Sequence, residues 1–235
     1  MKLLAFDTST ELMSVAVERS ASGGSMLWQH SGEGGAKTST QLIPVIQDLM
    51  LQAGLQFGDL DAIAFGRGPG SFTGLRTACS VAQGLAYGVQ IKVLPIDTLL
   101  AVAEEARFQF APERARYEVT ALLDARMDEM YLARYAFEHG QWTQSGDYDL
   151  IRPEDLQGDA QSCLAGNVFG SYAKRLPTAF TQRFNALPTA TAMLRLAPVL
   201  LASGAAVDPA QALPLYLRDK VAQTTLERAA QKDSL

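Results

Sequence analysis

The sequence predicts an α/β protein built from two similar units, and two observations support this prediction. Short apolar runs at residues 3–6, 62–65 and 91–96 are typical of buried strands, and helical patterns at 40–53, 73–87 and 98–108 alternate with them. A shift of 117 residues places Asp7 on Asp124 within similar stretches of sequence. Alternating strands and helices predict a largely buried sheet, and the repeat predicts that the unit occurs twice.

The first unit opens with three predicted strands at residues 3–6, 13–17 and 26–30. The helix at 40–53 ends before Gly54, a residue suited to a C-terminal cap. Its apolar residues form two stripes, namely Leu42, Val45, Ile46, Leu49 and Ala53 on one side, and Ile43 and Met50 beside it. A helix that lies on a sheet needs only one stripe. The second therefore predicts either a broader buried face or a partner surface.

A glycine-rich loop connects the strand at 62–65 to the helix at 73–87, with glycines at positions 66, 68, 70 and 74. The helix is rich in small residues, namely Ala78, Cys79, Ser80, Ala82, Gly84 and Ala86. Small residues let another backbone approach closely, either within the fold or in a second chain. The strand at 91–96 and the helix at 98–108 complete the unit.

The second unit is expected to begin near residue 109, with strands at 118–123 and 130–137. Its stretch "ALLDARMDEMYLA" (121–133) aligns with "LAFDTSTELMSVA" (4–16) at three identical positions: Asp7 with Asp124, Met13 with Met130, and Ala16 with Ala133. The shared pattern of an apolar strand, an Asp, a polar turn and a second apolar strand is what a repeated unit should show.

The second unit continues through Leu164 and Gly166 to a predicted helix at 190–202. We expect one domain at residues 1–108 and another at 109–210, with residues 211–235 completing the first. The charged stretch 223–235 is either a terminal helix or a frayed tail.

The composition is that of an ordinary globular protein, with 48% hydrophobic and 19% charged residues. A net charge of −5 argues against a protein that holds nucleic acid alone, because phosphate contacts need clustered Lys and Arg. Cys79 and Cys163 match no metal-ligand spacing or disulfide framework. The apolar start ends at Asp7, too early for a signal peptide, and no segment reaches the ~20 apolar residues of a membrane helix. We expect a cytoplasmic protein that contacts no membrane.

The glycine loop "AFGRGPGSFTGLR" (64–76) does not match the common phosphate-binding motifs. A Walker-type loop places Lys-Ser/Thr after its last glycine, whereas Leu75 and Arg76 follow Gly74. The dinucleotide fingerprint fails because no third glycine follows Gly70 at the required spacing. A helix N-terminus can still bind an anion, but the simpler interpretation is a tight strand-to-helix turn.

The other candidate residues form no complete catalytic set. The two histidines, His30 and His139, lie 109 residues apart and form no metal pair at helical spacing. Asp7 and Asp124 end equivalent strands, where a carboxylate holds magnesium or, more simply, caps a turn. Ser71 lacks the Gly-x-Ser-x-Gly elbow of serine hydrolases.

Several motifs together resemble those of the TsaB (YeaZ) family, bacterial members of the actin/hexokinase/Hsp70-like superfamily. The resemblance spans both units and rests on "LLAFDTSTELMSVAV", "TQLIPVIQDLM", "GRGPGSFTGLR", "AQGLAYG", "DARMDEMYLARY" and "PLYLR". It implies a duplicated ribonuclease H-like fold of two lobes, in agreement with the internal repeat.

The resemblance also implies a function in tRNA modification. Proteins of this family work with the catalytic paralogue TsaD and the ATPase TsaE, and together they place a threonylcarbamoyl group on an adenosine beside the tRNA anticodon. TsaB is the scaffold of that set. We therefore expect a non-catalytic subunit without a cofactor, which meets tRNA only through the complex.

One local comparison separates this chain from the catalytic paralogue, which carries a His-x-x-x-His metal pair after the strand that follows the glycine-loop helix. Thr98 and Val102 stand at those positions, and neither replaces an imidazole ligand. The superfamily's first phosphate motif also prefers a glycine where this chain has Ser9. The resemblance thus implies neither zinc peptidase activity nor a working nucleotide site.

These departures predict vestigial sites. The vestigial phosphate loop comprises Gly66, Gly68, Gly70, Ser71, Thr73 and Gly74, and the vestigial metal or nucleotide position comprises Asp7 and Asp124. The alternative is an active ATP-dependent phosphotransferase or ATPase of the same superfamily, with an inactive glycoprotease homologue as a third interpretation.

The helices at 40–53 and 73–87 are the expected contact with the catalytic paralogue, packed as a four-helix interface. The predicted contact residues are Ile43, Gln47, Met50, Ala78, Ala82 and Leu85, with Leu42 and Leu49 as the alternative stripe. An apolar surface seeks cover, so the same helices predict a weak homodimer when the chain is alone.

Overall fold

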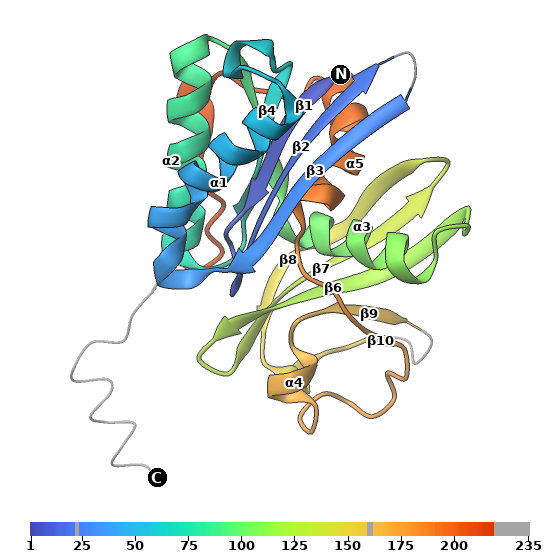
Figure 1. Ribbon diagram of the computed structural model, residues 1–235. Helices are drawn as coiled ribbons and strands as arrows, with labels where there is room; N and C mark the ends of the chain where they lie inside the picture. The colour runs from blue at the N-terminus through green and yellow to red at the C-terminus, as the bar shows by residue number, and fades with distance from the viewer. Residues whose placement is uncertain (22–23, 159–161, 219–235) are drawn as a thin grey trace, which may run out of the picture.

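The computed structural model describes residues 1–21, 24–158 and 162–218, and it contains two five-stranded sheets (Figure 1). The first sheet consists of β1 (Lys2–Asp7), β2 (Leu12–Ala21), β3 (Gly24–Glu33), β4 (Ala62–Gly68) and β5 (Lys92–Asp97). The second consists of β6 (Arg116–Arg126), β7 (Glu129–Glu138), β8 (Gln141–Ile151), β9 (Cys163–Gly166) and β10 (Arg183–Asn185). The helices are α1 (Thr38–Ala53), α2 (Phe72–Val89), α3 (Thr98–Phe110), α4 (Phe169–Tyr172) and α5 (Ala190–Ala202).

The two sheets have the same topology, which confirms the predicted duplication. The first has the order β3-β2-β1-β4-β5, and the second has the equivalent order β8-β7-β6-β9-β10. In each sheet the first three strands form antiparallel pairs, the fourth pairs parallel with the first, and the fifth pairs parallel with the fourth. This is the ribonuclease H-like α/β fold, present twice. The two copies differ in their helices, because η3 (Pro153–Asp155) stands where the first copy has α1, and α4 is far shorter than α2.

The repeated sequence forms the first hairpin of each sheet. Asp7 is the last residue of β1 and pairs with Ser14, while Asp124 pairs with Met130 just before a register shift near the end of β6. The second hairpin turns tightly, and Arg126, Met127 and Asp128 all have positive φ there. The aligned aspartates therefore occupy equivalent ends of equivalent strands.

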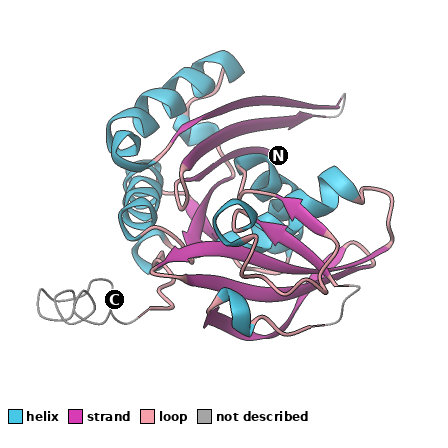
Figure 2. Ribbon diagram, turned by 90° about the horizontal axis from the view of Figure 1, so that it is seen from below, coloured by secondary structure: helices cyan, strands magenta, loops and turns pink. Residues whose placement is uncertain are grey.

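Helices α1 and α2 cover the outer face of the first sheet, whereas α3 and α5 lie between the two sheets (Figures 1 and 2). Leu99, Val102 and Ala106 on α3 pack in the core of the second sheet. Met193 and Ala197 on α5 pack against the other face of the first sheet. Each half of the chain thus contributes one helix to the layer between the sheets. The domain bounds at 1–108 and 109–210 stay a prediction.

The chain returns to the first half after α5. Val207 bridges to Val93 at the edge of β5, and Leu215 donates its backbone N–H to Arg67 O at 2.7 Å. The carbonyl of Ala212 accepts hydrogen bonds from Cys79 Sγ and Gln83 Nε2 on α2. Residues 207–218 therefore run along the first sheet and α2. The rest of the predicted completing segment, including residues 223–235, lies outside the described residues.

Most predicted elements are present with small differences at their ends. The strand predicted at 26–30 spans 24–33, and the helix predicted at 98–108 spans 98–110. Strands β8 and β10 and helix α4 were absent from the prediction. The described part of the chain contains no helix with the length and apolar character that a membrane crossing requires.

Candidate functional site

The glycine loop between β4 and α2 packs against the turn that follows β1. A Cβ atom on Gly66 would lie 1.8 Å from Asp7 Oδ2, and one on Gly74 would lie 1.8 Å from the carbonyl oxygen of Thr8. Neither position has room for a side chain. These two glycines therefore let β1 and its turn approach the loop at a distance that any other residue would prevent.

Hydrogen bonds fix the loop to its surroundings. Ser71 N donates to Ser9 O at 2.7 Å, and Thr8 Oγ1 donates to Gly74 O at 2.7 Å. On the other side, Gly68 N donates to Thr98 Oγ1 at 3.1 Å. The N–H groups of Gly68 and Ser71 are therefore committed to protein acceptors. This arrangement serves a strand-to-helix turn, and a vestigial phosphate role for Gly66, Gly68, Gly70, Ser71, Thr73 and Gly74 stays a prediction.

Asp7 is fully buried beneath this loop. Its Oδ1 accepts hydrogen bonds from Ser9 N at 2.8 Å and Ser9 Oγ at 2.6 Å, whereas Oδ2 has no partner among the described residues. Burial disfavours the charged form and raises the pKa of Asp7 to about 6, although the Ser9 bonds act in the opposite direction. Asp7 thus turns into the protein interior, away from solvent.

Asp124, in contrast, lies in an open cleft between the two halves. Its Oδ1 accepts hydrogen bonds from Arg126 N at 2.8 Å and Tyr172 Oη at 2.9 Å. Its backbone N–H donates to Asn167 Oδ1, and Asn167 Nδ2 reaches Glu11 Oε2 at 3.2 Å in the other half. Asp124 therefore organises the second-half wall of the cleft. Across the described residues, no group of three or more His, Cys, Asp or Glu side chains is placed to hold a metal ion.

The cleft has a volume of about 710 Å³ and receives residues from both halves. Its lining includes segments 9–11, 70–72, 123–127 and 215–218. Arg126 pairs with Asp124 at 3.4 Å, and Arg218 pairs with Glu129. Neither lysine nor histidine occurs among the described lining residues. Both arginines of this lining are paired with carboxylates, but Arg126 is largely exposed, so only Arg218 is held closely by its partner.

The two positions compared with a His-x-x-x-His metal pair are buried in the structure. Thr98 accepts the hydrogen bond from Gly68 N, and Val102 packs in the core of the second sheet. Both side chains have exposures of 0%. They act in packing and in the loop connection.

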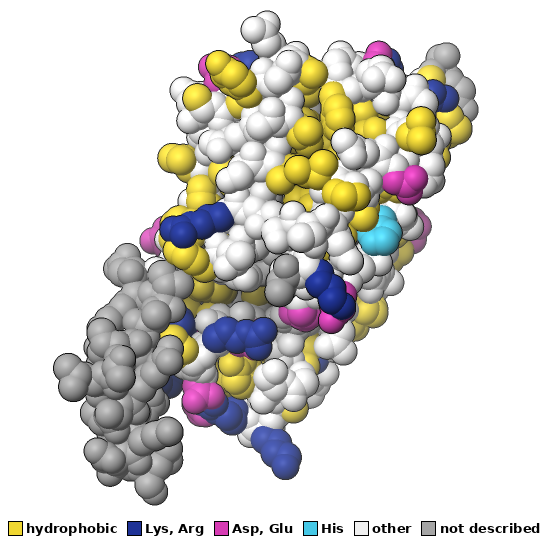
Figure 3. Space-filling model, turned by 60° about the vertical axis from the view of Figure 1, so that its left-hand side comes forward, with side chains coloured by type: hydrophobic (Ala, Val, Ile, Leu, Met, Phe, Trp, Pro, Cys, Tyr) yellow, Lys and Arg dark blue, Asp and Glu magenta, His cyan; other side chains and the backbone are white. Residues whose placement is uncertain are grey.

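The exposed face of α1 and α2 is the second candidate site. Leu51 and Tyr87 each have an exposed fraction of 78%, and Ile43 has one of 43%. Few charged side chains occur over the helical, upper part of this face, whereas charged groups gather lower down (Figure 3). A surface with few charges and large exposed apolar side chains is typical of a protein interface.

In the structure, the six predicted contact residues fall into two groups, one at least partly exposed and the other buried. Ile43 and Gln47 are exposed, and Leu85 is half-buried. Met50, Ala78 and Ala82 are buried in the core of the first sheet, together with the alternative residues Leu42 and Leu49. These buried residues were wrongly placed on the partner surface, because their side chains already pack on the sheet. Their stripe is the inner face of the two helices.

Sequence reasoning counted Ser80 and Gly84 among the small residues of α2, but it did not separate an outer stripe of Ser80, Gly84 and Gly88. All three are exposed, and a Cβ atom on Gly84 or Gly88 would meet no atom within 4 Å. Glycine in a helix interior costs about 1 kcal/mol relative to alanine, so these two weaken α2 without an internal steric reason. The i, i+4 spacing of the three residues was the available signal.

Comparisons with known proteins found a matching family model and similar proteins over most of the chain. The family model described as TsaD, tRNA N6-adenosine threonylcarbamoyltransferase, matches residues 33–233. A Haemophilus influenzae protein named tRNA threonylcarbamoyladenosine biosynthesis protein TsaB is 34% identical over 237 residues, which cover 94% of this chain and 95% of the relative. The Escherichia coli protein of the same name is 32% identical over 231 residues, covering 94% and 96%.

A solved structure shares the whole fold. The structure of YeaZ from Pseudomonas aeruginosa is similar with a TM-score of 0.80 at 37% sequence identity, and the match covers 92% of this chain and 99% of that one. The similarity includes both halves of the molecule.

Proposed function

Because the chain belongs to the TsaB family, we propose that it is a non-catalytic scaffold of the complex that forms threonylcarbamoyladenosine next to the tRNA anticodon. In this proposal it binds the catalytic paralogue TsaD and, within the assembly, the ATPase TsaE. The observation that carries the proposal is the exposed outer face of α1 and α2, which carries few charges and has Leu51 and Tyr87 as its most exposed large side chains.

The helix face suits a partner that also presents helices. Gly84 and Gly88 leave the surface of α2 low, so a second helix can approach its backbone closely. Tyr87 lies next to Gly88 on α2, and Leu51 and Ile43 on α1 add further exposed apolar area. The same face supports a weak homodimer when the free chain has no paralogue to bind.

Two features support a non-catalytic role. Asp7, a residue that the fold would use at a nucleotide site, is buried under Gly66 with Oδ1 held by Ser9. Thr98 and Val102 occupy core positions and have no metal-binding chemistry. The net charge of −5 fits a subunit that meets tRNA through its partners. Cys79 and Cys163 are both buried free thiols, which fits a cytoplasmic protein.

The test is light scattering after size exclusion, with this chain mixed with TsaD from the same source. Gly84→Glu places a charge on the low surface of α2 and also replaces a poor helix former, so the fold should tolerate it. Gly170→Glu in α4 is the matched control, because Gly170 is also an exposed helical glycine with open space around it. We expect a 1:1 complex for the wild type and Gly170→Glu, and its loss for Gly84→Glu.

Other outcomes would point elsewhere. A complex that survives Gly84→Glu would mean that a different surface binds TsaD. No complex with the wild type would refute the scaffold role and return attention to the alternative, an ATP-dependent phosphotransferase. That alternative requires submillimolar binding of ATP with magnesium by calorimetry, abolished by Asp7→Ala.

A further inference from the structure

Strand β3 forms a long, open edge of the first sheet. It contains ten residues, pairs with β2 in unbroken register from Gly24 to Glu33, and has no neighbour on its other side within the described residues. From Gly24 to Gly32 it has no Asp, Glu, Lys or Arg. An edge of this kind offers a row of unpaired N–H and C=O groups to another strand.

The hydrogen-bond pattern identifies which residues face outward. Gly34 N donates to Glu11 O at 2.8 Å, so the even-numbered residues of this segment direct their backbone groups toward β2. Ser20 N donates to Met1 O on the other side of β2, which agrees with this assignment. The odd-numbered residues Ser25, Leu27 and Gln29 therefore direct their N–H and C=O groups away from the sheet.

The other three sheet edges are protected against such pairing. β5 is covered by Val207, which exchanges two backbone hydrogen bonds with Val93 at 2.8 and 3.0 Å. β8 carries Asp147 and Asp149 and faces an irregular register in β7. β10 has only three residues. Protection at three edges and none at β3 indicates that β3 is kept open for a partner strand.

Three consecutive apolar side chains, Met26, Leu27 and Trp28, lie at the centre of the open strand β3. Met26 and Leu27 have exposed fractions of 47% and 49%, and half-buried Trp28 packs against the core below α1. Residues 26 and 28 share one face of the sheet and residue 27 lies on the other, because side chains alternate along a strand. Each face at the centre of the edge thus presents an apolar side chain, with Ser25 and Gln29 on either side of Leu27.

We propose that β3 pairs antiparallel with β3 of a second copy of this chain, about a twofold axis at Leu27. Such an axis is perpendicular to the sheet, so it pairs odd residues with odd and even with even, as the outward groups require. Leu27 then lies opposite Leu27 of the partner subunit, and Met26 lies opposite Trp28 of the partner subunit. The two sheets become one continuous sheet.

The strand's own sequence selects a second copy as the occupant. The ladder about Leu27 runs from Gly24 to His30, a stretch without any Asp, Glu, Lys or Arg, so no like charges oppose each other. Aromatic and aliphatic residues form favourable cross-strand pairs, and this register places the thioether of Met26 against an indole. An axis at Trp28 would instead set Met26 against His30. The apolar match therefore favours an axis at Leu27 over one at Trp28.

Sedimentation velocity tests the contact in a chain that lacks the helix-face contact. The reference is Leu51→Lys, which places a charge on the exposed face of α1 and leaves β3 unchanged. We expect this reference to dimerise reversibly. Adding Leu27→Lys should raise the dimer dissociation constant at least tenfold, because two like charges would meet across the axis, with an unchanged melting temperature showing intact folding. A monomeric reference, or equal dissociation constants, would overturn the proposal.

Disulfide trapping tests the register. Leu27→Cys should form a covalent dimer on mild oxidation, since directly opposed Cα atoms lie about 5.5 Å apart, within disulfide range. Ser31→Cys is the matched control on the same exposed strand, where the proposed register separates the two sulfurs by about 27 Å. The two native cysteines are buried. Equal trapping of both variants, or none of Leu27→Cys, would contradict the proposed pairing.

Discussion

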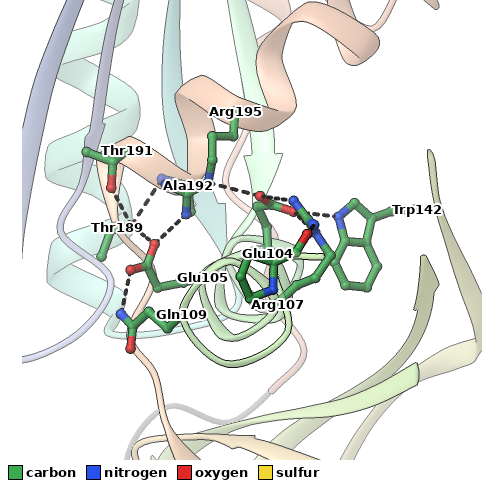
Figure 4. A network of polar contacts seen from close by, with 10 residues as sticks. Glu104, Glu105, Arg107, Gln109, Trp142, Thr189, Thr191, Ala192 and Arg195 are labelled. Carbon is green, nitrogen blue, oxygen red and sulfur yellow. Dashed lines mark hydrogen bonds and ion pairs between the residues drawn. The ribbon is translucent and has the colours of Figure 1, made fainter. Parts of the chain in front are cut away.

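Arg195 on α5 donates a hydrogen bond to Glu104 on α3, with 2.9 Å between Nε and Oε1 (Figure 4). Glu104 is buried, and it also accepts hydrogen bonds from Arg107 and from Trp142 Nε1. Arg195 extends to Glu105 Oε2 at 2.6 Å. The network joins the two helices that lie between the sheets to a strand of the second sheet, so it connects the halves of the molecule.

Removing Arg195 should therefore destabilise the protein. Arg195→Met leaves two buried carboxylates with one cation fewer, and an uncompensated buried charge costs about 3–5 kcal/mol. Because Arg195 is partly exposed and Arg107 remains, we expect a loss of about 2–4 kcal/mol in the free energy of unfolding, measured with urea. Arg116→Met, at an exposed ion pair, is the control and should change stability by less than about 1 kcal/mol. Equal effects would show that the network does not stabilise the fold.

Asp7 should make stability depend on pH. Its pKa is raised from 3.8 to about 6, so the folded state favours the protonated form. The contribution of Asp7 to the free energy of unfolding is complete below about pH 4 and is lost as the pH rises through about 6. This loss amounts to about 3 kcal/mol at neutral pH. Asp7→Asn keeps an oxygen for Ser9 and carries no charge.

We expect Asp7→Asn to be more stable than wild type at pH 7.5, by about 1–2 kcal/mol once the buried amide has lost its bonds to water. At pH 4.5 this advantage should vanish or reverse. Urea unfolding at the two pH values measures both quantities. If Asp7→Asn remained markedly more stable than the wild type at pH 4.5, the difference in the free energy of unfolding would have the wrong sign. That result would contradict the proposed effect of burying Asp7.

Two glycines in the same helix should respond oppositely to alanine. Gly74→Ala would bring Cβ to 1.8 Å from Thr8 O, and we expect it to lower the free energy of unfolding by about 3 kcal/mol or more. Gly84→Ala meets open space and should raise it by about 0.5–1 kcal/mol. Thermal melts of the two variants measure the difference. A neutral Gly74→Ala would mean that the turn after β1 does not press on α2.

The two cysteines should be unreactive in the native protein. Burial raises the pKa of the Cys79 and Cys163 thiols, and the thiolate is the reactive form. A thiol reagent at pH 8 should modify the folded chain at least ~100-fold more slowly than the chain in denaturant. Rapid modification of either cysteine in the native protein would show that its surroundings open readily.

Apolar runs and the repeat predicted the first sheet and the start of the second, because buried strands must be apolar. Strand β8, "QWTQSGDYDLI", was not predicted because it is an exposed edge strand without an apolar run. Backbone pairing with β7 holds it in the sheet. Strand β10 has three residues, too few for any periodicity. Length and exposure, more than ambiguity in the pattern, determined which elements could be predicted.

For the proposed partner surface, composition pointed to α1 and α2, but three of the predicted contact residues, Met50, Ala78 and Ala82, are buried on the inner side of these helices. Ala78 and Ala82 are small because α2 lies close on the sheet, whereas Gly84 and Gly88 are small with nothing above them. Both stripes consist of small residues in the sequence. Only the position of the sheet in the structure shows which stripe faces inward and which faces outward. The repeat correctly aligned Asp7 with Asp124. Their environments differ because Asp7 is buried under Gly66, and that burial depends on how the glycine loop packs against β1 in the folded protein.

The most direct test of the scaffold account is hydroxyl-radical footprinting of this chain with and without TsaD. Tyr87 on the outer face of α2 is 78% exposed, and Met127 at the cleft is 49% exposed, so both should be oxidised in the free chain. We expect TsaD to lower the oxidation of Tyr87 severalfold and to leave that of Met127 unchanged. Unchanged oxidation of Tyr87, with protection of Met127, would place the partner in the cleft and contradict the proposed helix face.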